Sequence, residues 1–107
     1  MEKNKRQMEQ MDRDALSRMI LSFLRERGAW AFRVHGSPLL NEGIPDILAC
    51  YRGKFLALEV NRTDRRLSKL RKIELVRLFR AGGVSAVVYS VADVQRLLDK
   101  IAEHCSS

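Results

Sequence analysis

The sequence predicts an α/β fold, a three-layer α/β/α domain with a central mixed β-sheet. Along the chain, apolar residues alternate between a helical period and strand-like runs, in the order helix, strand, two adjacent strands, helix, strand, helix. The two adjacent strands are apolar on both faces, which is typical of strands covered on both sides. A strand that follows a hairpin by way of a helix needs a crossover connection, so at least one strand pair is expected to be parallel.

The length and composition predict a single domain. The chain has 107 residues, and 46% of them are hydrophobic, which is enough for a modest core. Residues 1–11 are charged and polar, and we expect a flexible basic arm there. The folded domain is predicted over residues 12–107.

The first predicted helix begins at Asp12 or Asp14, either of which can cap it, and ends at Gly28. A short strand over 30–34 and a loop over 35–43 follow the helix. The apolar residues of the helix have the spacing of one buried stripe: Leu16, Met19, Ile20, Phe23 and Leu24.

The pattern in the second half of the sequence predicts a helix over 67–81 and a buried strand over 85–89. Gly82 and Gly83 end the helix. Ser90 and Asp93 match a capping box at the start of a last helix. The apolar arc of the 67–81 helix is wider than one stripe, so we expect one of its sides to pack against a partner subunit.

Two carboxylates are the most informative feature of the predicted hairpin. Arg52 and Gly53 form a plausible two-residue turn between apolar runs over 47–51 and 55–60. This turn places Asp46 directly opposite Glu59, with Cβ atoms roughly 4.5–5.5 Å apart, where two like charges destabilise a sheet. Two interpretations follow. The pair holds a metal cation, or it lies at the sheet end, solvated or paired with arginines.

Charge favours a nucleic-acid partner. Lys and Arg number 20 against 13 Asp and Glu, which gives a net charge of +7 and a pI near 10.0. Such a balance attracts polyanions. Several basic residues follow the Glu59 strand closely. A solvated helix start is one explanation of this cluster, but phosphate contact is favoured because the cluster adjoins the two carboxylates. We expect phosphate contacts from Arg52, Arg62, Arg65, Arg66 and Lys69.

Other classes of protein are disfavoured. No apolar run approaches the roughly 20 residues of a membrane span, and the N-terminus is too polar for a signal peptide. The two cysteines, Cys50 and Cys105, suggest neither a disulfide framework nor a zinc site. We expect an intracellular protein, in the cytoplasm of a bacterial or phage-infected cell.

Pro45-Asp46 enters the predicted hairpin, Glu59-Val60-Asn61 ends it, and Leu67-Ser68 starts the next predicted helix. Together these motifs resemble the PD-(D/E)XK nuclease superfamily, and most closely its VRR-NUC (virus-type replication-repair nuclease) branch. The resemblance implies a restriction-endonuclease-like fold in which Asp46, Glu59 and the backbone carbonyl of Val60 bind Mg²⁺ or Mn²⁺. It also implies that Asp14 is a possible accessory acid, although helix capping explains Asp14 equally well.

Two positions depart from the family pattern. The resemblance places a catalytic lysine where this chain has Asn61, and a glutamine where it has Arg71. Asparagine can hydrogen-bond a water or a phosphate oxygen but carries no charge. Three explanations remain open: Lys54, Lys69 or Lys72 supplies the charge from elsewhere, Asn61 itself serves beside the metal, or the chain is an inactive variant that still binds nucleic acid.

The function implied by the resemblance is a metal-dependent, structure-selective DNA endonuclease. It would act as a homodimer on branched DNA such as Holliday junctions, with Asp46, Glu59 and Asn61 at the catalytic centre. A catalytically impaired DNA-binding module is the main alternative. An assembly subunit whose basic surface binds an acidic protein is the third.

Overall fold

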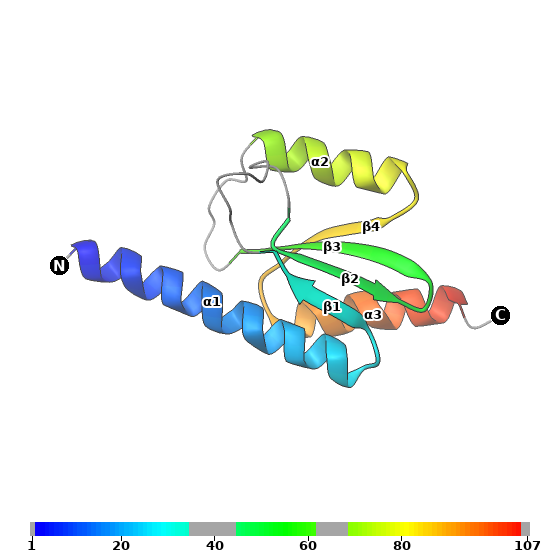
Figure 1. Cartoon of the computed structure of the whole chain (residues 1–107), viewed down its shortest axis with the longest axis horizontal. Helices are drawn as coiled ribbons and strands as arrows, with labels where there is room; N and C mark the ends of the chain where they lie inside the picture. Colours follow the sequence, from blue (N-terminus) through cyan, green and yellow to red (C-terminus); the bar gives the residue numbers. More distant parts are fainter. Residues whose placement is uncertain (1, 35–44, 62–68, 106–107) are drawn as a thin grey trace.

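A central β-sheet lies between two helical layers in the computed structural model, which describes residues 2–34, 45–61 and 69–105, the side chains of 2–12 and 105 excepted (Figure 1). Two helices cover one face of the sheet, α1 (Glu2–Glu26) and α3 (Val91–Cys105), and α2 (Lys69–Arg80) lies on the other side. The predicted three-layer α/β/α class is therefore confirmed. The strands are β1 (Trp30–Arg33), β2 (Ile47–Tyr51), β3 (Lys54–Val60) and β4 (Val84–Val88).

The sheet is mixed, as predicted. Its strand order is β1-β2-β3-β4, with antiparallel pairing from β1 to β3 and parallel pairing between β3 and β4. The parallel pair is possible because α2 carries the chain across between the two strands. The carboxyl end of β3 therefore lies beside the carboxyl end of β4.

The turn at Arg52 and Gly53 determines the register of the hairpin. Both residues have positive φ, 51° and 81°, as a type I′ turn requires. Tyr51 pairs with Lys54 and Ile47 with Leu58, as the sequence predicted. One further step along the same register places Asp46 opposite Glu59, just beyond the last paired residues.

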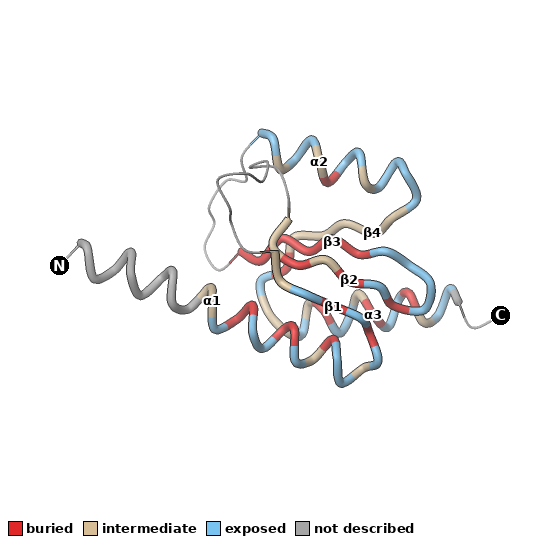
Figure 2. The backbone as a smooth tube through the Cα atoms, in the orientation of Figure 1, coloured by how far each residue is buried: buried red, intermediate tan, exposed pale blue. Residues whose placement is uncertain are grey.

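The core lies between the sheet and the α1–α3 layer (Figure 2). Residues of even number in β3 and of odd number in β2 point into it, because strand side chains alternate between faces. The buried stripe of α1 packs on the same face. The core's fully buried large side chains are Ile20, Leu24, Ile47, Leu56, Leu58, Val94 and Leu98.

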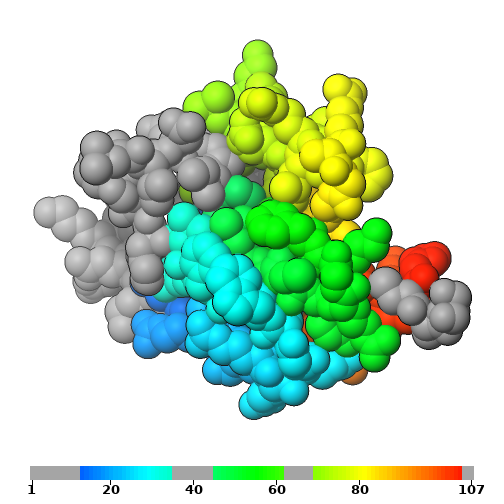
Figure 3. Space-filling view, turned by 45° about the vertical axis from the view of Figure 1, so that its right-hand side comes forward, coloured from blue at the N-terminus to red at the C-terminus, as the bar shows by residue number. Residues whose placement is uncertain are grey.

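The opposite face of the sheet is only partly covered, which corrects the expectation of cover on both sides. The element that packs against this face is α2, and its main contact is with β4. Trp30 is 62% exposed, and Phe32 and Phe55 are exposed as well. Figure 3 looks onto this side, with the cyan surface of β1 and the green surface of the hairpin next to yellow-green α2.

Three helix ends can be compared with the predictions. Gly28 and Gly82 have positive φ just after α1 and α2, as predicted for helix stops. The Ser90 hydroxyl accepts from the Asp93 N–H at 3.2 Å, which confirms the capping box.

The beginning of α1 differs from the prediction. The helix starts at Glu2, so the capping role assigned to Asp12 or Asp14 is wrong, and residues 2–11 are helical where we expected an arm. Flexibility of this segment stays a prediction. None of the helices in the ranges given above is long and apolar enough to cross a membrane.

The turn gives a test of the hairpin register. Gly53→Ala is expected to lower the free energy of unfolding by about 1 kcal/mol, because a Cβ is disfavoured at positive φ. A Cβ at Gly53 would meet no atom within 4 Å, so the loss comes from the backbone alone. Urea unfolding measures it. Arg52→Asn, at the neighbouring position, is the control and should be at least as stable, and equal stability of Gly53→Ala and wild type would contradict a type I′ turn.

Candidate active site

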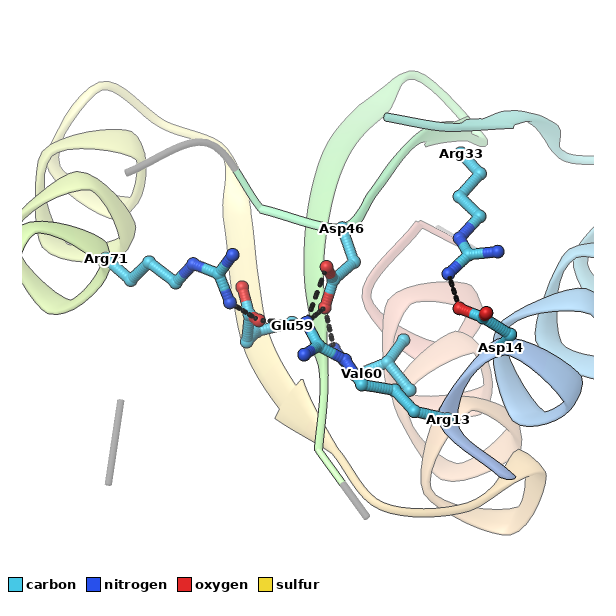
Figure 4. A network of polar contacts seen from close by, with 7 residues as sticks. All are labelled: Arg13, Asp14, Arg33, Asp46, Glu59, Val60 and Arg71. Carbon is cyan, nitrogen blue, oxygen red and sulfur yellow. Dashed lines mark hydrogen bonds and ion pairs between the residues drawn. The ribbon is translucent and has the colours of Figure 1, made fainter. Parts of the chain in front are cut away.

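Asp46 and Glu59 meet at the edge of the sheet where β2 begins and β3 ends (Figure 4). The backbone of Asp46 is held by β1, since its carbonyl accepts from the Val34 N–H at 2.7 Å. Its side chain is held by β3, since Oδ2 accepts from the Val60 N–H at 2.9 Å. Hydrogen bonds to the backbone therefore hold both the main chain and the side chain of Asp46 in place without a cation.

Arg13 of α1 bridges the two carboxylates. Its Nη2 lies 2.9 Å and 3.0 Å from the two oxygens of Asp46 and 3.4 Å from Oε1 of Glu59. One guanidinium nitrogen therefore lies within 3.4 Å of three carboxylate oxygens on two strands. A cation at this position neutralises both acids, and in this structure that cation is the Arg13 guanidinium.

Arg71 of α2 neutralises Glu59 from the other side. Its Nη1 contacts Oε1 of Glu59 at 2.5 Å. Arg71 lies four residues before Leu75, the buried residue of α2, so both belong to the side of the helix that faces the sheet. Of the two interpretations of the carboxylate pair, arginine pairing is what this structure contains.

Burial gives Glu59 an unusual protonation equilibrium. The residue is 1% exposed. Burial raises the pKa of Glu59, the hydrogen bond and negative charge of Asp46 raise it further, and the pKa reaches about 8 despite Arg71 and Arg13. Burial also acts to raise the pKa of Asp46, but the hydrogen bond with Glu59, the Arg13 charge and the Val60 N–H together lower it. Asp46 is the stronger acid of the pair.

Oxygen ligands for a hard divalent cation are present at this edge. Oε2 of Glu59 is buried and has no hydrogen-bond partner, and Asp46 offers a second carboxylate. With the backbone carbonyl of Val60 they form an all-oxygen set, which suits Mg²⁺ or Mn²⁺. The residues fit such an ion. Over residues 13–34, 45–61 and 69–104, no cluster of three His, Cys, Asp or Glu side chains occurs, so no further acid joins the pair.

Asp14 does not contact the two carboxylates. It forms an ion pair with Arg33 of β1, away from Asp46 and Glu59, as Figure 4 shows. The hydrogen bond from Arg33 lowers the pKa of Asp14. The geometry therefore gives no support to an accessory metal role for Asp14.

The predicted basic residues divide into three groups. Lys69 and Lys72 lie on α2 but are exposed, whereas Arg71 between them turns to the site. Lys54 and Arg52 lie at the turn, about 17 Å of strand away from Glu59, so neither can supply charge to the carboxylates. Arg62, Arg65 and Arg66 lie outside the described residues.

Asn61 follows β3 directly and is buried. Its N–H donates to the carbonyl of Val88 at 2.9 Å, which continues the β3–β4 pairing by one residue. Side chains alternate along a strand, so Asn61 is on the same face as Glu59. The position that the resemblance assigns to a lysine is therefore beside the carboxylates.

Arg13 is the site residue that sequence reasoning missed. A signal was present, because Arg13 and Ser17 extend the buried stripe of Ile20 and Leu24 by i, i+4 and i+7 spacing. Polar residues on the core-facing stripe of a helix indicate a polar partner inside. Ser17 is fully buried and its Oγ has no partner among the described residues.

A family comparison agrees with this geometry. The family model of the archaeal Holliday junction resolvase (Hjc) matches residues 8–81, which is more than half of the chain. The chain belongs to the Hjc family. The matched range includes Arg13, Asp46, Glu59 and Arg71.

Two solved structures are similar to the chain. Hjc from Archaeoglobus fulgidus, a Holliday junction resolvase from an archaeal hyperthermophile, is 29% identical over 69% of this chain, with a TM-score of 0.55. The chain spans 64% of the length of that Hjc. A VRR_NUC domain matches 81% of this chain and 94% of its own length with a TM-score of 0.67; at 19% identity, this match shows the fold alone. No protein with curated function matches the chain.

The comparisons confirm the expected family and fold. The predicted resemblance to PD-(D/E)XK nucleases of the VRR-NUC type agrees with the Hjc family match and the VRR_NUC structure. The mixed four-stranded sheet with helices on both sides is the restriction-endonuclease-like architecture that the resemblance implied.

The raised pKa of Glu59 predicts how stability depends on pH in metal-free buffer. Folded Glu59 keeps its proton up to about pH 8, whereas in the unfolded chain its pKa is near 4.5. Between these values the folded state binds more protons, so the free energy of unfolding should fall as the pH rises. Urea unfolding across this range in EDTA measures the slope.

The matched variants for this measurement are Glu59→Gln and Glu74→Gln. Glu59→Gln cannot titrate, so the contribution of Glu59 to the pH dependence of the free energy of unfolding should be lost. Glu74→Gln, which removes an exposed carboxylate of α2, should keep that contribution. Stability that rises between pH 4.5 and pH 8 because of Glu59 would contradict the raised pKa.

Proposed function

We propose that this member of the Hjc family is a metal-dependent endonuclease that cuts branched DNA, with four-way junctions as the substrate. The observation that carries the proposal is the opposed pair of buried Glu59 and partly buried Asp46 at the sheet edge, which arginines from both helical layers contact. Membership in the family of archaeal Holliday junction resolvases supports the choice of substrate. The net charge of +7 supports a polyanionic partner.

Asp46, Glu59 and the carbonyl of Val60 would hold Mg²⁺ or Mn²⁺. When bound, such an ion lowers the pKa of a water and stabilises negative charge on a phosphate. Glu59 must lose its proton to act as a ligand, and the nearby guanidinium groups favour that loss. Asn61, on the Glu59 face, can orient a water or a phosphate oxygen by hydrogen bonds, but it cannot act as a base.

Positive charge beside the carboxylates would come from arginine. Arg71 already contacts Glu59, whereas the lysines considered from the sequence are exposed on α2 or lie at the distant turn. A guanidinium is always charged and binds phosphate through a planar fork of donors. Arg71 would therefore supply charge that the family pattern assigns to lysine. Lys69 would contact the DNA phosphates, and the same role is proposed for Arg62, Arg65 and Arg66 from their place in the sequence.

A homodimer would present two such sites to one junction. The exposed apolar side chains of α2 and of the uncovered sheet face belong to one side of the molecule, because Arg71 of α2 reaches Glu59 on the face that carries Phe55. Exposed apolar side chains gathered on one side of a molecule are typical of protein interfaces. A second copy is the partner that paired cuts require. The exposed large apolar residues of α2 are Leu70, Ile73, Val76 and Phe79.

A DNA-binding module without catalysis is the second candidate. Two observations favour it: Asn61 stands at the lysine position, and three of the four carboxylate oxygens are occupied by arginine nitrogens. Such a protein would keep the basic surface and bind junctions without cutting them.

Cleavage of a labelled four-way junction in Mn²⁺ distinguishes the two candidates. Asp46→Ala is expected to reduce the cleavage rate about 100-fold or more, because one of the two acidic metal ligands is lost. Asn61→Lys is expected to raise the rate. The control is Asp99→Ala on α3, which removes an exposed carboxylate that pairs with Arg27. Tight binding of the junction without cleavage, in wild type and Asn61→Lys alike, would favour the non-catalytic module, and absence of binding would rule out both.

Sedimentation equilibrium tests the dimer. Wild type is expected to be dimeric, and the double variant Ile73→Asp, Phe79→Asp to be monomeric, because buried unpaired charge opposes association. Met19→Asp replaces an apolar residue of α1 that is 59% exposed in the opposite layer, and it should stay dimeric. A monomeric wild type at micromolar concentration, or a dimer unaffected by the double variant, would contradict this interface.

A further inference from the structure

Arg13 occupies the place that a metal ion would need. Its Nη2 contacts Oδ1 and Oδ2 of Asp46 and Oε1 of Glu59, the oxygen that Arg71 also contacts. Oε2 of Glu59 is the carboxylate oxygen of the pair that has no partner. A divalent cation held by both side chains would therefore have to compete with a guanidinium for the same oxygens.

The geometry indicates that Arg13 rather than Arg71 is the group that leaves. Arg13 bridges both acids and uses both oxygens of Asp46, so it is the guanidinium with which an ion that bridges the acids would compete. Arg71 contacts Glu59 through Oε1 alone and leaves Oε2 available. Both guanidinium groups have a route toward solvent, since the side chain of Arg13 is 24% exposed and that of Arg71 is 29% exposed, so the bridging contacts are what distinguish the two.

We propose that Arg13 is a resident counter-ion which a divalent metal displaces, and that the displaced guanidinium then binds the phosphate of the DNA substrate. The proposal rests on the metal-dependent function proposed above. A metal ion that bridges the two acids would compete with Arg13 for the same oxygens, and the repulsion between the two cations adds to this competition. A released guanidinium favours the nearest anion, and in the loaded site that anion is the DNA phosphate beside the metal.

This exchange would link the metal to the substrate. Without metal, the Arg13 guanidinium lies against Asp46 and within 3.4 Å of Oε1 of Glu59, so it stabilises the negative charge that the pair carries. With metal and DNA, the same side chain adds positive charge close to Asn61, where the family pattern has a lysine. One arginine would thus lower the affinity for metal in the free protein and raise the cleavage rate of the loaded protein.

Mn²⁺ binding to the full chain without DNA tests the first step. Arg13→Gln removes the charge and leaves a shorter side chain that ends in a polar amide, and Arg18→Gln, which makes the same change at an exposed arginine of α1, is the matched control. Arg13→Gln is expected to bind Mn²⁺ roughly ten- to a hundredfold more tightly than Arg18→Gln, because a charge-assisted hydrogen-bonded pair no longer has to be broken. Titration calorimetry measures the affinity.

Thermal unfolding is a second measurement of Mn²⁺ binding, and it can be used even if Arg13→Gln is unstable without metal. In EDTA this variant should unfold at a lower temperature than Arg18→Gln, and Mn²⁺ should raise its midpoint by more. Arg13→Lys keeps the charge but loses the fork, and its Mn²⁺ affinity should lie between those of wild type and Arg13→Gln. Equal Mn²⁺ affinity of Arg13→Gln and Arg18→Gln would overturn the competition and leave the proposed function intact.

Junction cleavage at saturating Mn²⁺ tests the second step. Arg13→Gln should cleave at least about tenfold more slowly than Arg18→Gln despite its tighter metal binding, because a charged contact to phosphate is lost. A merely structural role would weaken both metal binding and cleavage. An unchanged rate would overturn the phosphate role, and absence of Mn²⁺ binding in every variant would overturn the metal-dependent function together with this inference.

Discussion

The placement of a buried carboxylate, Glu59, directly opposite a partly buried one, Asp46, is the constraint on which the rest of the site depends. Glu59 is almost inaccessible to water, and Asp46 is fixed against the backbone of β3. Like charges in a medium of low dielectric constant must protonate or acquire cations. The structure uses both solutions, because Glu59 has a raised pKa and two guanidinium groups contact the pair.

The layered fold brings these cations to the same point from opposite sides. Arg13 comes from α1 in one layer and Arg71 from the first turn of α2 in the other. The parallel pairing of β3 with β4 requires a crossover connection, and α2 is part of it. The chain must run back from the carboxyl end of β3 to the start of β4, so the first turn of α2 lies near the carboxyl end of β3. The absence of lysine at position 61 is thus accompanied by arginines from both layers.

Part of the chemistry could be predicted from local sequence. The turn at Arg52 and Gly53 determines the register, and counting from it places Asp46 opposite Glu59. The order of elements predicted the mixed sheet and the layers. The prediction that both sheet faces are covered was wrong, because α2 does not extend over β1. The residues of a strand show whether its faces are apolar, but they do not show which element lies above each face.

The sequence by itself determined the fold class, the hairpin register and the acidic pair, because turn geometry and hydrophobic period act over a few neighbouring residues. Only the tertiary structure decided which cations meet that pair. Arg13 is 33 residues before Asp46 in the chain, and Arg71 is 12 residues after Glu59. Their approach depends on how helices of two layers pack on the sheet, and a basic chain offers many equivalent arginines and lysines from which local sequence cannot choose.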